Sequence, residues 1–444
     1  MSIETNTKVL PGFMELLPEE QIEFDRIKNI IETTYKQYGF TALDTPVIER
    51  SEVLLKKTGG ETTRQIYRFE NDDIDLALRF DLTVPLARYV ADHFNELSFP
   101  FRRCHIAKVY RGEKPQKGRF REFYQCDIDV IGHNELSIKY DAEIPSIIYF
   151  LFKKLDFGKF TIRINNRKLL NGLLNALGVK DKAIEVLRII DKVQKISVDD
   201  FNASLKTLGL SENLIETLYK FIDIKGSVIE VLQQLKGLGI TDDLFNIGIS
   251  ELESITGIMK KMNVDESYYS IDLSIARGLD YYTGTVYETT LDNHEDLGSV
   301  CSGGRFDDLA SGYIDEKLPG VGISIGLNRL FYQFREAGLI RCTKKTIADA
   351  VIVPFESENL ATALRVSQEL RNQGFNIDVL LQDIPVKDKL QYVRKKDAPF
   401  AIQIGSEEEA SGLLSLRFIQ GKELIKKTVG INDLVRIMKE YINK

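Results

Sequence analysis

Cysteine and histidine are scarce in this sequence, and neither type is clustered. The 444 residues include four cysteines and four histidines. The cysteines form no Cys-x-x-Cys pair, which argues against a zinc ribbon and a disulfide framework and favours a reducing compartment. The histidines are equally dispersed, so we expect no metal site built from protein side chains.

Long hydrophobic runs are also absent. The longest, such as residues 147–152, are far shorter than a bilayer span. The first residues, MSIETNTKVLPGF, contain no basic stretch that leads into an apolar segment, so no secretory signal is visible. We therefore expect a cytoplasmic protein with no membrane partner.

An excess of positive charge is the third absence. The formal net charge is −7, which excludes a general nucleic-acid binder and gives no reason to expect DNA as a partner. One local basic stretch, RGEKPQKGRFR from Arg111 to Arg121, has five basic residues and one acid. Its charge alone leaves a solvated hairpin tip as an alternative. A second basic group could guide RNA: Lys387, Lys389, Arg394, Lys395 and Lys396.

The length predicts two or three domains. Helical patterns replace strands at residues 169–264, which indicates an all-helical insertion. It separates two β-rich blocks at residues 1–168 and 265–338. Strands alternate with helices at residues 346–444 and predict a separate α/β domain.

Several elements can be placed from periodicity and turn residues. Residue 46 is a proline, so a strand at residues 40–48 would lie at an edge, a bulge or a subunit boundary. Helices are predicted at residues 21–38, 83–94 and 141–155, and strands at 66–71, 73–80, 105–113, 120–132 and 350–354.

The predicted hairpin at residues 105–132 combines arginines with an aromatic ring. Strand alternation places Arg111 with Glu113, and Arg119 and Arg121 with Phe123, on one face. Arginine forks match phosphate oxygens and rings stack on bases, so this face suits a polyphosphate and a purine. Three further residues of the return strand share that parity: Gln125, Asp127 and Asp129.

The glycine-rich stretch GVGISIG at residues 320–326 has the spacing GxGxxxG rather than GxGxxG, and no strand precedes it. A dinucleotide site is therefore not favoured. The stretch instead predicts a strand that a ligand approaches closely, followed by a helix from about Leu327. Arg329 would lie in its first turn, where the helix dipole disfavours a cation unless an anion or a ring covers it. An ordinary surface arginine is the alternative.

These stretches carry a family resemblance. YRGEKPQKGRFREFYQCDIDVIG resembles motif 2 of class II aminoacyl-tRNA synthetases, GVGISIGLNRL their motif 3, and YGFTALDTPVIE their motif 1. RGLDYYTGTVYE, residues 277–288, is similar to the signature peptide of the histidyl-tRNA synthetase family. SGGRFDDL resembles that family's second peptide, and LRFDLTVPLARYVA its amino-acid pocket. The resemblance runs in order from about Leu10 to the carboxyl terminus.

The resemblance implies an α+β fold. An antiparallel-sheet catalytic domain with a helical insertion would precede an α/β anticodon-binding domain. It also implies a ligase that activates L-histidine with ATP and Mg²⁺ to histidyl-adenylate, releases pyrophosphate, and transfers histidine to the 3′ end of tRNA(His). Motif 1, with its proline, implies a homodimer.

The resemblance further implies roles for single residues. The histidine-binding set would be Asp81, Leu82, Thr83, Arg111, Gln125, Asp129, Arg277, Tyr281 and Tyr282. Within it, Tyr281, Tyr282 and Asp129 would surround the imidazole. Arg277 would lie between the substrate carboxylate and the α-phosphate, and would be catalytic together with Arg111.

The nucleotide and tRNA roles follow in the same way. Arg111 would contact the α-phosphate and Arg119 the distal phosphates. Glu113 would contact the adenine edge, and Phe123 and Arg329 would enclose the adenine ring. Gln116 and Arg121 would read the acceptor end of the tRNA.

One close alternative shares the resemblance. The regulatory subunit of ATP phosphoribosyltransferase is a catalytically silent paralogue that lacks the carboxyl-terminal domain and usually loses catalytic arginines. This chain has all four: Arg111, Arg119, Arg277 and Arg329. Departures from the bacterial pattern are Asp81 and Asp129, where glutamate is usual, and Phe306, where tyrosine is common.

Overall fold

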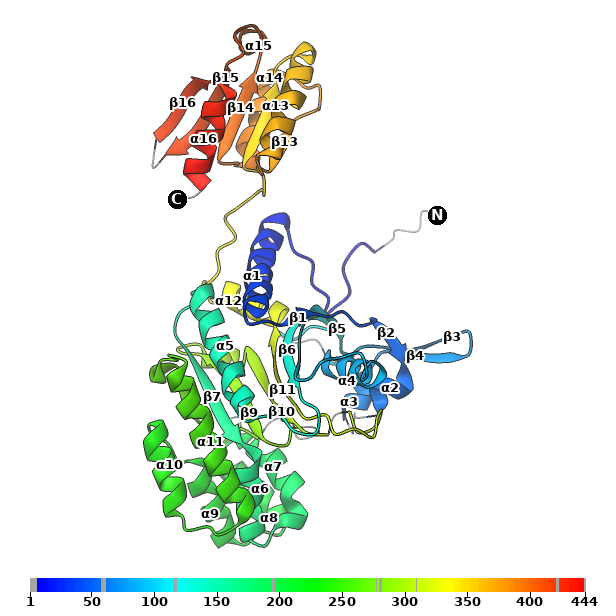
Figure 1. The fold of residues 1–444 in the computed structure, drawn as a ribbon, viewed down its shortest axis with the longest axis vertical. Helices are drawn as coiled ribbons and strands as arrows, with labels where there is room; N and C mark the ends of the chain where they lie inside the picture. The colour runs from blue at the N-terminus through cyan, green and yellow to red at the C-terminus, as the bar shows by residue number, and fades with distance from the viewer. Residues whose placement is uncertain are drawn as a thin grey trace. The chain divides into compact units, whose positions relative to one another are not determined.

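The computed structural model describes residues 6–56, 61–114, 118–193, 196–276, 278, 282–308, 310–420 and 423–442 (Figure 1). The chain divides into two compact units. The first comprises Met1–Glu15 and Ile27–Ile340, and the second comprises Leu16–Arg26 and Arg341–Lys444.

An eight-stranded sheet forms the centre of the first unit. Its inner neighbours are antiparallel, and only the edge pairs β1–β5 and β7–β8 are parallel. The predicted antiparallel-sheet domain is confirmed. From one edge to the other the strands are β1 (Thr41–Ala42), β5 (Phe101–Tyr110), β6 (Glu122–Ile131), β11 (Gly320–Gly326), β10 (Cys301–Phe306), β9 (Thr285–Leu291), β7 (Phe160–Asn166) and β8 (Tyr269–Ile271).

Helices cover one face of this sheet. Helix α5 (Lys139–Leu155) packs on β11, and α12 (Leu327–Glu336) packs on β6. Tyr35, in α1 (Pro18–Gln37), is fully buried and donates its hydroxyl hydrogen to the Cys126 carbonyl at 3.1 Å. Because side chains alternate along a strand, the intervening residues of β6 face the opposite side, which these helices leave uncovered.

A smaller sheet follows the first strand and corrects one prediction. Residues 40–48 are not one strand, because β1 ends at Ala42 and β2 (Ile48–Arg50) belongs to a three-stranded sheet with β4 (Ile74–Leu78) and β3 (Arg68–Asn71). Pro46 lies between them and cannot donate to a ladder. The Arg79 guanidinium donates to the neighbouring Thr45 carbonyl at 2.6 Å. The nearby helices are α2 (Ser51–Leu55), α3 (Glu61–Gln65) and α4 (Thr83–Asp92).

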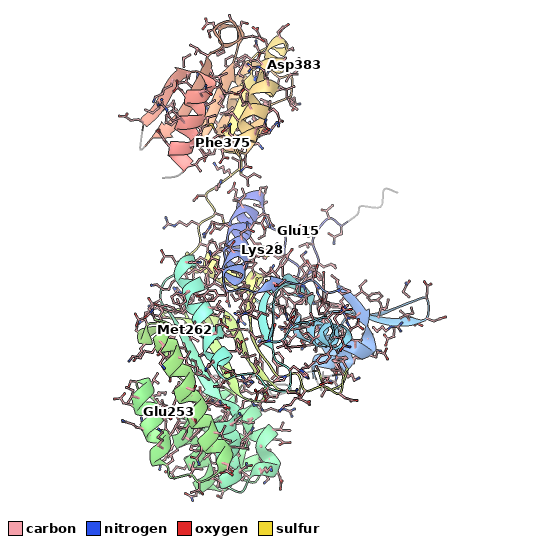
Figure 2. The ribbon with its side chains drawn as sticks, in the orientation of Figure 1. Glu15, Lys28, Glu253, Met262, Phe375 and Asp383 are labelled. Carbon is pink, nitrogen blue, oxygen red and sulfur yellow. The ribbon has the colours of Figure 1, made fainter. Side chains whose placement is uncertain are left out.

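The region predicted as a helical insertion consists of helices, and every α-helix described in it except α7 has a polar side chain as its N-cap. Ser211 accepts a hydrogen bond from the Leu214 N–H, Ser227 forms a capping box with Glu230, and Asp242 caps the helix that carries Glu253 (Figure 2). The exact boundaries of this helical region, predicted at residues 169–264, stay a prediction. The helices are α6 (Arg167–Ala176), α7 (Ala183–Ile190), α8 (Val198–Thr207), α9 (Glu212–Ile222), α10 (Val228–Gly237) and α11 (Asp243–Lys261).

The second unit contains its own five-stranded sheet, which confirms a separate α/β domain. Phe375 and Asp383, labelled in Figure 2, flank its first edge strand. The sheet order is β13 (Ile377–Val379), β12 (Ala350–Pro354), β14 (Phe400–Ile404), β15 (Leu414–Gln420) and β16 (Glu423–Val429). The helices are α13 (Leu360–Asn372), α14 (Val386–Lys396), α15 (Ser406–Ser411) and α16 (Ile431–Ile442).

Two features of this unit differ from expectation. Strand β16 was not predicted, because it is a largely exposed edge strand without apolar alternation. Lys389 cannot guide RNA as predicted. Its side chain is buried, and its Nζ donates to the carbonyls of Pro354 at 2.9 Å and Phe355 at 3.3 Å. Within the described residues, no helix has the length and apolarity needed to span a bilayer.

Candidate active site

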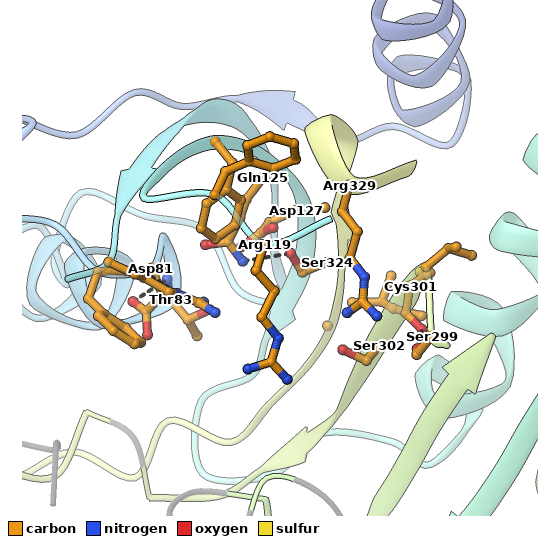
Figure 3. A pocket seen from close by; sticks show the side chains of 18 of the residues that line it. Asp81, Thr83, Arg119, Gln125, Asp127, Ser299, Cys301, Ser302, Ser324 and Arg329 are labelled. Atoms are coloured by element: carbon orange, nitrogen blue, oxygen red, sulfur yellow. Dashed lines mark hydrogen bonds between the residues drawn. The ribbon is translucent and has the colours of Figure 1, made fainter. Parts of the chain in front are cut away.

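A cavity of about 460 Å³ opens on the uncovered face of the central sheet (Figure 3). Figure 3 shows Asp81 and Thr83 on one side of Arg119, and Arg329, Ser299 and Ser302 on the other. Many predicted site residues line this cavity: Asp81, Thr83, Arg111, Glu113, Arg119, Phe123, Gln125, Asp129, Tyr282 and Arg329. Gln116, Arg277 and Tyr281 lie outside the described residues.

The predicted alternation of β6 holds at the cavity floor. Phe123, Gln125, Asp127 and Asp129 all line the cavity. The alternation does not extend to Arg121, because β6 begins only at Glu122. The Arg121 guanidinium instead donates to the Glu113 carbonyl at 3.0 Å.

A buried arginine lies beneath the acidic floor. Arg103, opposite Asp129 in the β5–β6 ladder, is fully buried and places its Nη2 2.8 Å from an Asp129 carboxylate oxygen. The same Nη2 donates to the Leu82 carbonyl at 3.1 Å. Leu82 is therefore linked to the floor through its backbone, while its buried side chain packs in an apolar cluster with Val109.

Burial dominates the electrostatics of the three cavity aspartates. It raises the pKa of Asp127 to about 7 and that of Asp129 to about 6, although Arg103 opposes both shifts. Burial also raises the pKa of Asp81, against hydrogen bonds from two backbone N–H groups and the charges of Arg111 and Arg103. Among the described residues, these three carboxylates have one fully buried cation beside them, Arg103, so the site suits a cationic group.

Asp81 is held by the start of helix α4. Its Oδ1 accepts hydrogen bonds from the backbone N–H groups of Thr83 at 3.1 Å and Val84 at 2.9 Å. These N–H groups have no partner within the helix, and an acidic residue at this end is favoured by the helix dipole. The sequence DLTVP therefore fixes the carboxylate at the cavity wall.

Neighbouring strands complete the floor with small polar residues. Ser324 lies opposite Asp127 in the β6–β11 ladder, and its hydroxyl accepts a hydrogen bond from the Gln125 side-chain amide at 2.8 Å. Gly322 lies opposite Asp129, where a Cβ atom would be 2.0 Å from an Asp129 carboxylate oxygen. Only glycine fits there, which explains the glycine at this position of β11.

Arginines and aromatic rings form the other part of the cavity. The Arg111 guanidinium lies 4.4 Å from the Phe80 ring centre and 5.0 Å from that of Phe123. Arg119 pairs with Glu113 at 3.6 Å, and its side chain is about half exposed. Cationic groups and flat rings can hold a polyphosphate and a purine base.

Arg329 occupies the predicted first turn of α12. Its Nη2 donates to the Leu297 carbonyl at 3.0 Å, and Gln333 donates to the same oxygen at 2.5 Å. Gly298 has φ +68°, a backbone conformation that favours glycine, and a Cβ atom there would lie 2.9 Å from this nitrogen. The backbone at 297–298 thus orients the guanidinium toward the cavity, despite its unfavourable place in the helix dipole.

The stretch RGLDYYTGTVYE is described at Gly278 and from Tyr282 onward. Tyr282 donates its N–H to the Gly278 carbonyl at 2.9 Å, and its ring fills the space that a Cβ atom on Gly278 would need. The predicted strand character of its end is confirmed, because β9 begins at Thr285. Phe306, where tyrosine was expected, also lines the cavity and is buried.

The second peptide, SGGRFDDL, supports this stretch through a buried ion pair. Arg305 contacts both carboxylate oxygens of Asp141, which is fully buried in α5. The Arg305 carbonyl accepts the N–H of Thr283 at 2.8 Å, and Asp307 accepts the Thr283 hydroxyl hydrogen at 2.6 Å. The arginine and aspartate of the peptide therefore position the residues next to Tyr282.

Sequence reasoning missed several residues of the site. Arg103 gave no signal of its own, although its place opposite Asp129 would follow from the hairpin register. The strand parity placed Asp127 on the cavity face, but the sequence assigned no role to it. Other cavity residues to which the sequence assigned no role are Phe80, Phe120, Ser299, Ser302, Gly322 and Ser324.

Comparison with known proteins identifies the family. A model of the family described as histidyl-tRNA synthetase matches residues 12–330. The chain belongs to the histidyl-tRNA synthetase family. A model described as anticodon binding domain matches residues 349–441 of the same synthetase.

Relatives and solved structures agree with this membership. A histidine–tRNA ligase of Clostridium tetani is 51% identical over 97% of this chain and 98% of its own length. A histidine–tRNA ligase of Finegoldia magna is 43% identical over 97% of this chain and 99% of its own length. The crystal structure of histidyl-tRNA synthetase from Nostoc sp. PCC 7120 matches this synthetase with a TM-score of 0.90 and 39% identity, and covers 99% of this chain and 100% of that one.

The regulatory-subunit alternative is not favoured. A structure from Bacillus halodurans, described as an ATP phosphoribosyltransferase regulatory subunit/histidyl-tRNA synthetase, matches with a TM-score of 0.76 but only 20% identity. That likeness shows a shared fold alone. The anticodon-binding domain and the ligase relatives at 43–51% identity support the synthetase.

Proposed function

We propose that the cavity binds L-histidine and ATP and carries out the two steps of a histidine–tRNA ligase, the activity of the family to which the chain belongs. One observation carries this proposal. A buried acidic floor for the ammonium group of an amino acid and a wall of arginines and aromatic rings for a nucleotide line the same cavity. In the first step a histidine carboxylate oxygen attacks the α-phosphate of ATP and pyrophosphate leaves.

Histidine would bind over β6 and the start of α4. Asp81, Thr83 and Gln125 are assigned to the backbone of the amino acid, because they offer acceptors and a hydroxyl for its ammonium and carboxylate groups. Asp129, Tyr281 and Tyr282 are assigned to the imidazole ring. The contact between Arg103 and Asp129 supports this assignment, since it orients the Asp129 carboxylate.

ATP would bind along the arginines. Arg111 is assigned to the α-phosphate, Arg119 to the distal phosphates and Glu113 to the adenine edge, while Phe123 and Arg329 enclose the adenine ring. Mg²⁺ would enter with ATP and keep mostly water and phosphate ligands. Arg111 and Arg277 would lower the repulsion between the attacking carboxylate and the α-phosphate, so the reaction needs positioning and charge rather than a general base.

In the second step a hydroxyl of the terminal tRNA ribose attacks the activated carbonyl, and AMP leaves. Gln116 and Arg121 are assigned to the acceptor end of tRNA(His). The anticodon-binding domain, with the exposed basic residues of α14, would bind the other end of the tRNA. Such contacts weaken steeply with salt.

We also propose a homodimer that works in the cytoplasm. Apolar side chains that solvent reaches on the small sheet and the segment before it, Val47, Ile48, Phe69 and Ile74, support a subunit interface. The buried thiols of Cys104, Cys126 and Cys301 support a reducing compartment. Sedimentation velocity at micromolar concentration tests the dimer, and a fully active monomer would contradict it.

Pyrophosphate exchange tests the substrate. With ATP, Mg²⁺ and each of the twenty amino acids in turn, only histidine should support exchange at an appreciable rate. Arg111→Ala should lower the histidine-dependent rate by about a hundredfold or more, because it removes a preorganised charge at the α-phosphate. Comparable exchange with proline, glycine or threonine would refute the assignment.

A further inference from the structure

The floor of the cavity holds one carboxylate that the assignments above leave unused. Asp127 is only 2% exposed and lines the cavity between Gln125 and Asp129. Its Oδ1 has no hydrogen-bond partner among the described residues, and no described cation lies within ion-pair distance of it. A buried, unpaired carboxylate is costly and calls for a partner of opposite charge.

A second unpaired acceptor lies beside it. The Gln125 side chain is 8% exposed, and its Oε1 also lacks a donor among the described residues. Its amide nitrogen donates to the Ser324 hydroxyl at 2.8 Å, and the same hydroxyl interacts with the Asp127 carboxylate. Both side chains therefore meet at Ser324 in the lining of the cavity (Figure 3).

The neighbouring carboxylates each have a partner, although Asp129 Oδ2, which is ion-paired with Arg103, also accepts no hydrogen bond from the described residues. Asp129 has Arg103 at 2.8 Å, and Asp81 accepts two backbone N–H groups. Among these three carboxylates of the described cavity, Asp127 is the one with neither an ion pair nor a backbone N–H donor, so it can best accept a cation with several hydrogens to donate. Of the three polar groups of histidine, the carboxylate would be repelled, and the neutral ring offers one N–H. The α-ammonium offers three donors and a full positive charge.

We propose that Asp127 is a further histidine-binding residue, whose Oδ1 accepts a hydrogen bond from the α-ammonium together with the Oε1 of Gln125. This inference rests on the proposed function of the cavity. It also explains the position of Ser324, because this hydroxyl contacts and orients the side chains of both Gln125 and Asp127. The acidic floor thereby selects a free amino acid over a ligand that has the same ring and carboxylate but no amine.

A ligand–residue cycle tests the contact. Binding of L-histidine and of imidazolepropionic acid, which lacks only the α-amine, is measured by calorimetry on the full-length protein and on Asp127→Asn. The variant should bind histidine roughly tenfold to hundredfold more weakly, because a hydrogen bond to a charged group is lost. Its affinity for imidazolepropionic acid should change by no more than about threefold.

The control is Asp292→Asn. Asp292 directly follows β9 and accepts the Thr161 hydroxyl hydrogen at 2.7 Å, but it does not line the cavity. It should leave both affinities unchanged. If Asp127→Asn folds poorly, as its melting temperature will show, Ser324→Ala replaces it. That variant keeps the charge but loses the orienting hydroxyl, and should weaken histidine binding selectively and to a smaller degree.

Two results would overturn the proposal. Equal weakening of both ligands would mean that Asp127 contacts the ring or only supports the fold, and unchanged histidine binding would mean that it makes no contact. In both cases histidine-dependent pyrophosphate exchange by the unaltered protein would persist. Absence of that exchange would instead refute the proposed function itself.

Discussion

Replacing Arg103 with methionine should destabilise the protein in a way that depends on pH. The substitution removes the buried cation from beneath Asp127 and Asp129 while keeping an unbranched side chain of similar length. Two contacts disappear, the 2.8 Å approach to Asp129 and the hydrogen bond to the Leu82 carbonyl. Loss of the hydrogen bond to the Leu82 carbonyl and of side-chain packing should lower the free energy of unfolding by about 1–2 kcal/mol at any pH.

The pH-dependent part follows from the carboxylates. With Arg103 present, the pKa of Asp129 is raised to about 6, above its ordinary value. Without Arg103 the pKa rises further, so the variant must keep a proton that the unaltered protein releases. Each pH unit above 6 then adds about 1.4 kcal/mol to the loss of stability. Between pH 6 and pH 8.5 the difference should grow by about 3 kcal/mol, and stability falls as pH rises.

Urea unfolding of the full-length protein at pH 6 and pH 8.5, followed by circular dichroism, measures both parts. Arg102→Met is the matched control on the same strand. Arg102 forms a bidentate pair with Glu143 at 2.9 and 3.0 Å, and both side chains are about a fifth exposed. Its loss should cost about 1 kcal/mol at both pH values, because solvent reaches the remaining carboxylate. An equal loss for Arg103→Met at the two pH values would refute the reasoning.

Two further substitutions test the floor and the wall of the cavity. Gly322→Ala should raise the KM for histidine more than about tenfold, because the new Cβ would lie 2.0 Å from Asp129 and 2.6 Å from the Ile128 carbonyl. Gly326→Ala, whose nearest neighbour atom would be 3.8 Å away, is the control, and an equal effect of both would contradict this explanation. Phe123→Ala should raise the KM for ATP roughly tenfold to hundredfold through lost base stacking and leave histidine affinity nearly unchanged. A change in histidine affinity alone would place Phe123 in the wrong subsite.

Local patterns predict the strongly periodic elements of this fold. The alternation of residues in β6 is enough to place Gln125, Asp127 and Asp129 on one face, and that face lines the cavity. The glycine-rich stretch predicts a strand followed by a helix at Leu327, and this is confirmed. Both predictions depend only on residues that are close in sequence, so the periodicity of side-chain types is sufficient to make them.

The errors occur where a distant residue decides the local structure. The segment around Pro46 reads as a strand, but its course depends on Arg79, which binds the Thr45 carbonyl. Lys389 reads as a surface lysine of a basic helix, but the carbonyls of Pro354, the last residue of β12, and of Phe355 hold its ammonium group inside the second unit. The sequence pattern within either segment cannot predict these contacts, because the partner residues lie elsewhere in the chain.

For Asp127, neither family resemblance nor strand alternation is sufficient to assign a role. The family resemblance assigns roles to Asp81 and Asp129 but none to Asp127. Strand alternation nevertheless places Asp127 on the same face of β6 as Asp129. Only the structure shows that Arg103 lies against Asp129 at 2.8 Å, whereas no described cation pairs with Asp127. Since a buried charge needs compensation, the unpaired carboxylate gives the most direct physical reason for this cavity to require the ammonium group of its substrate.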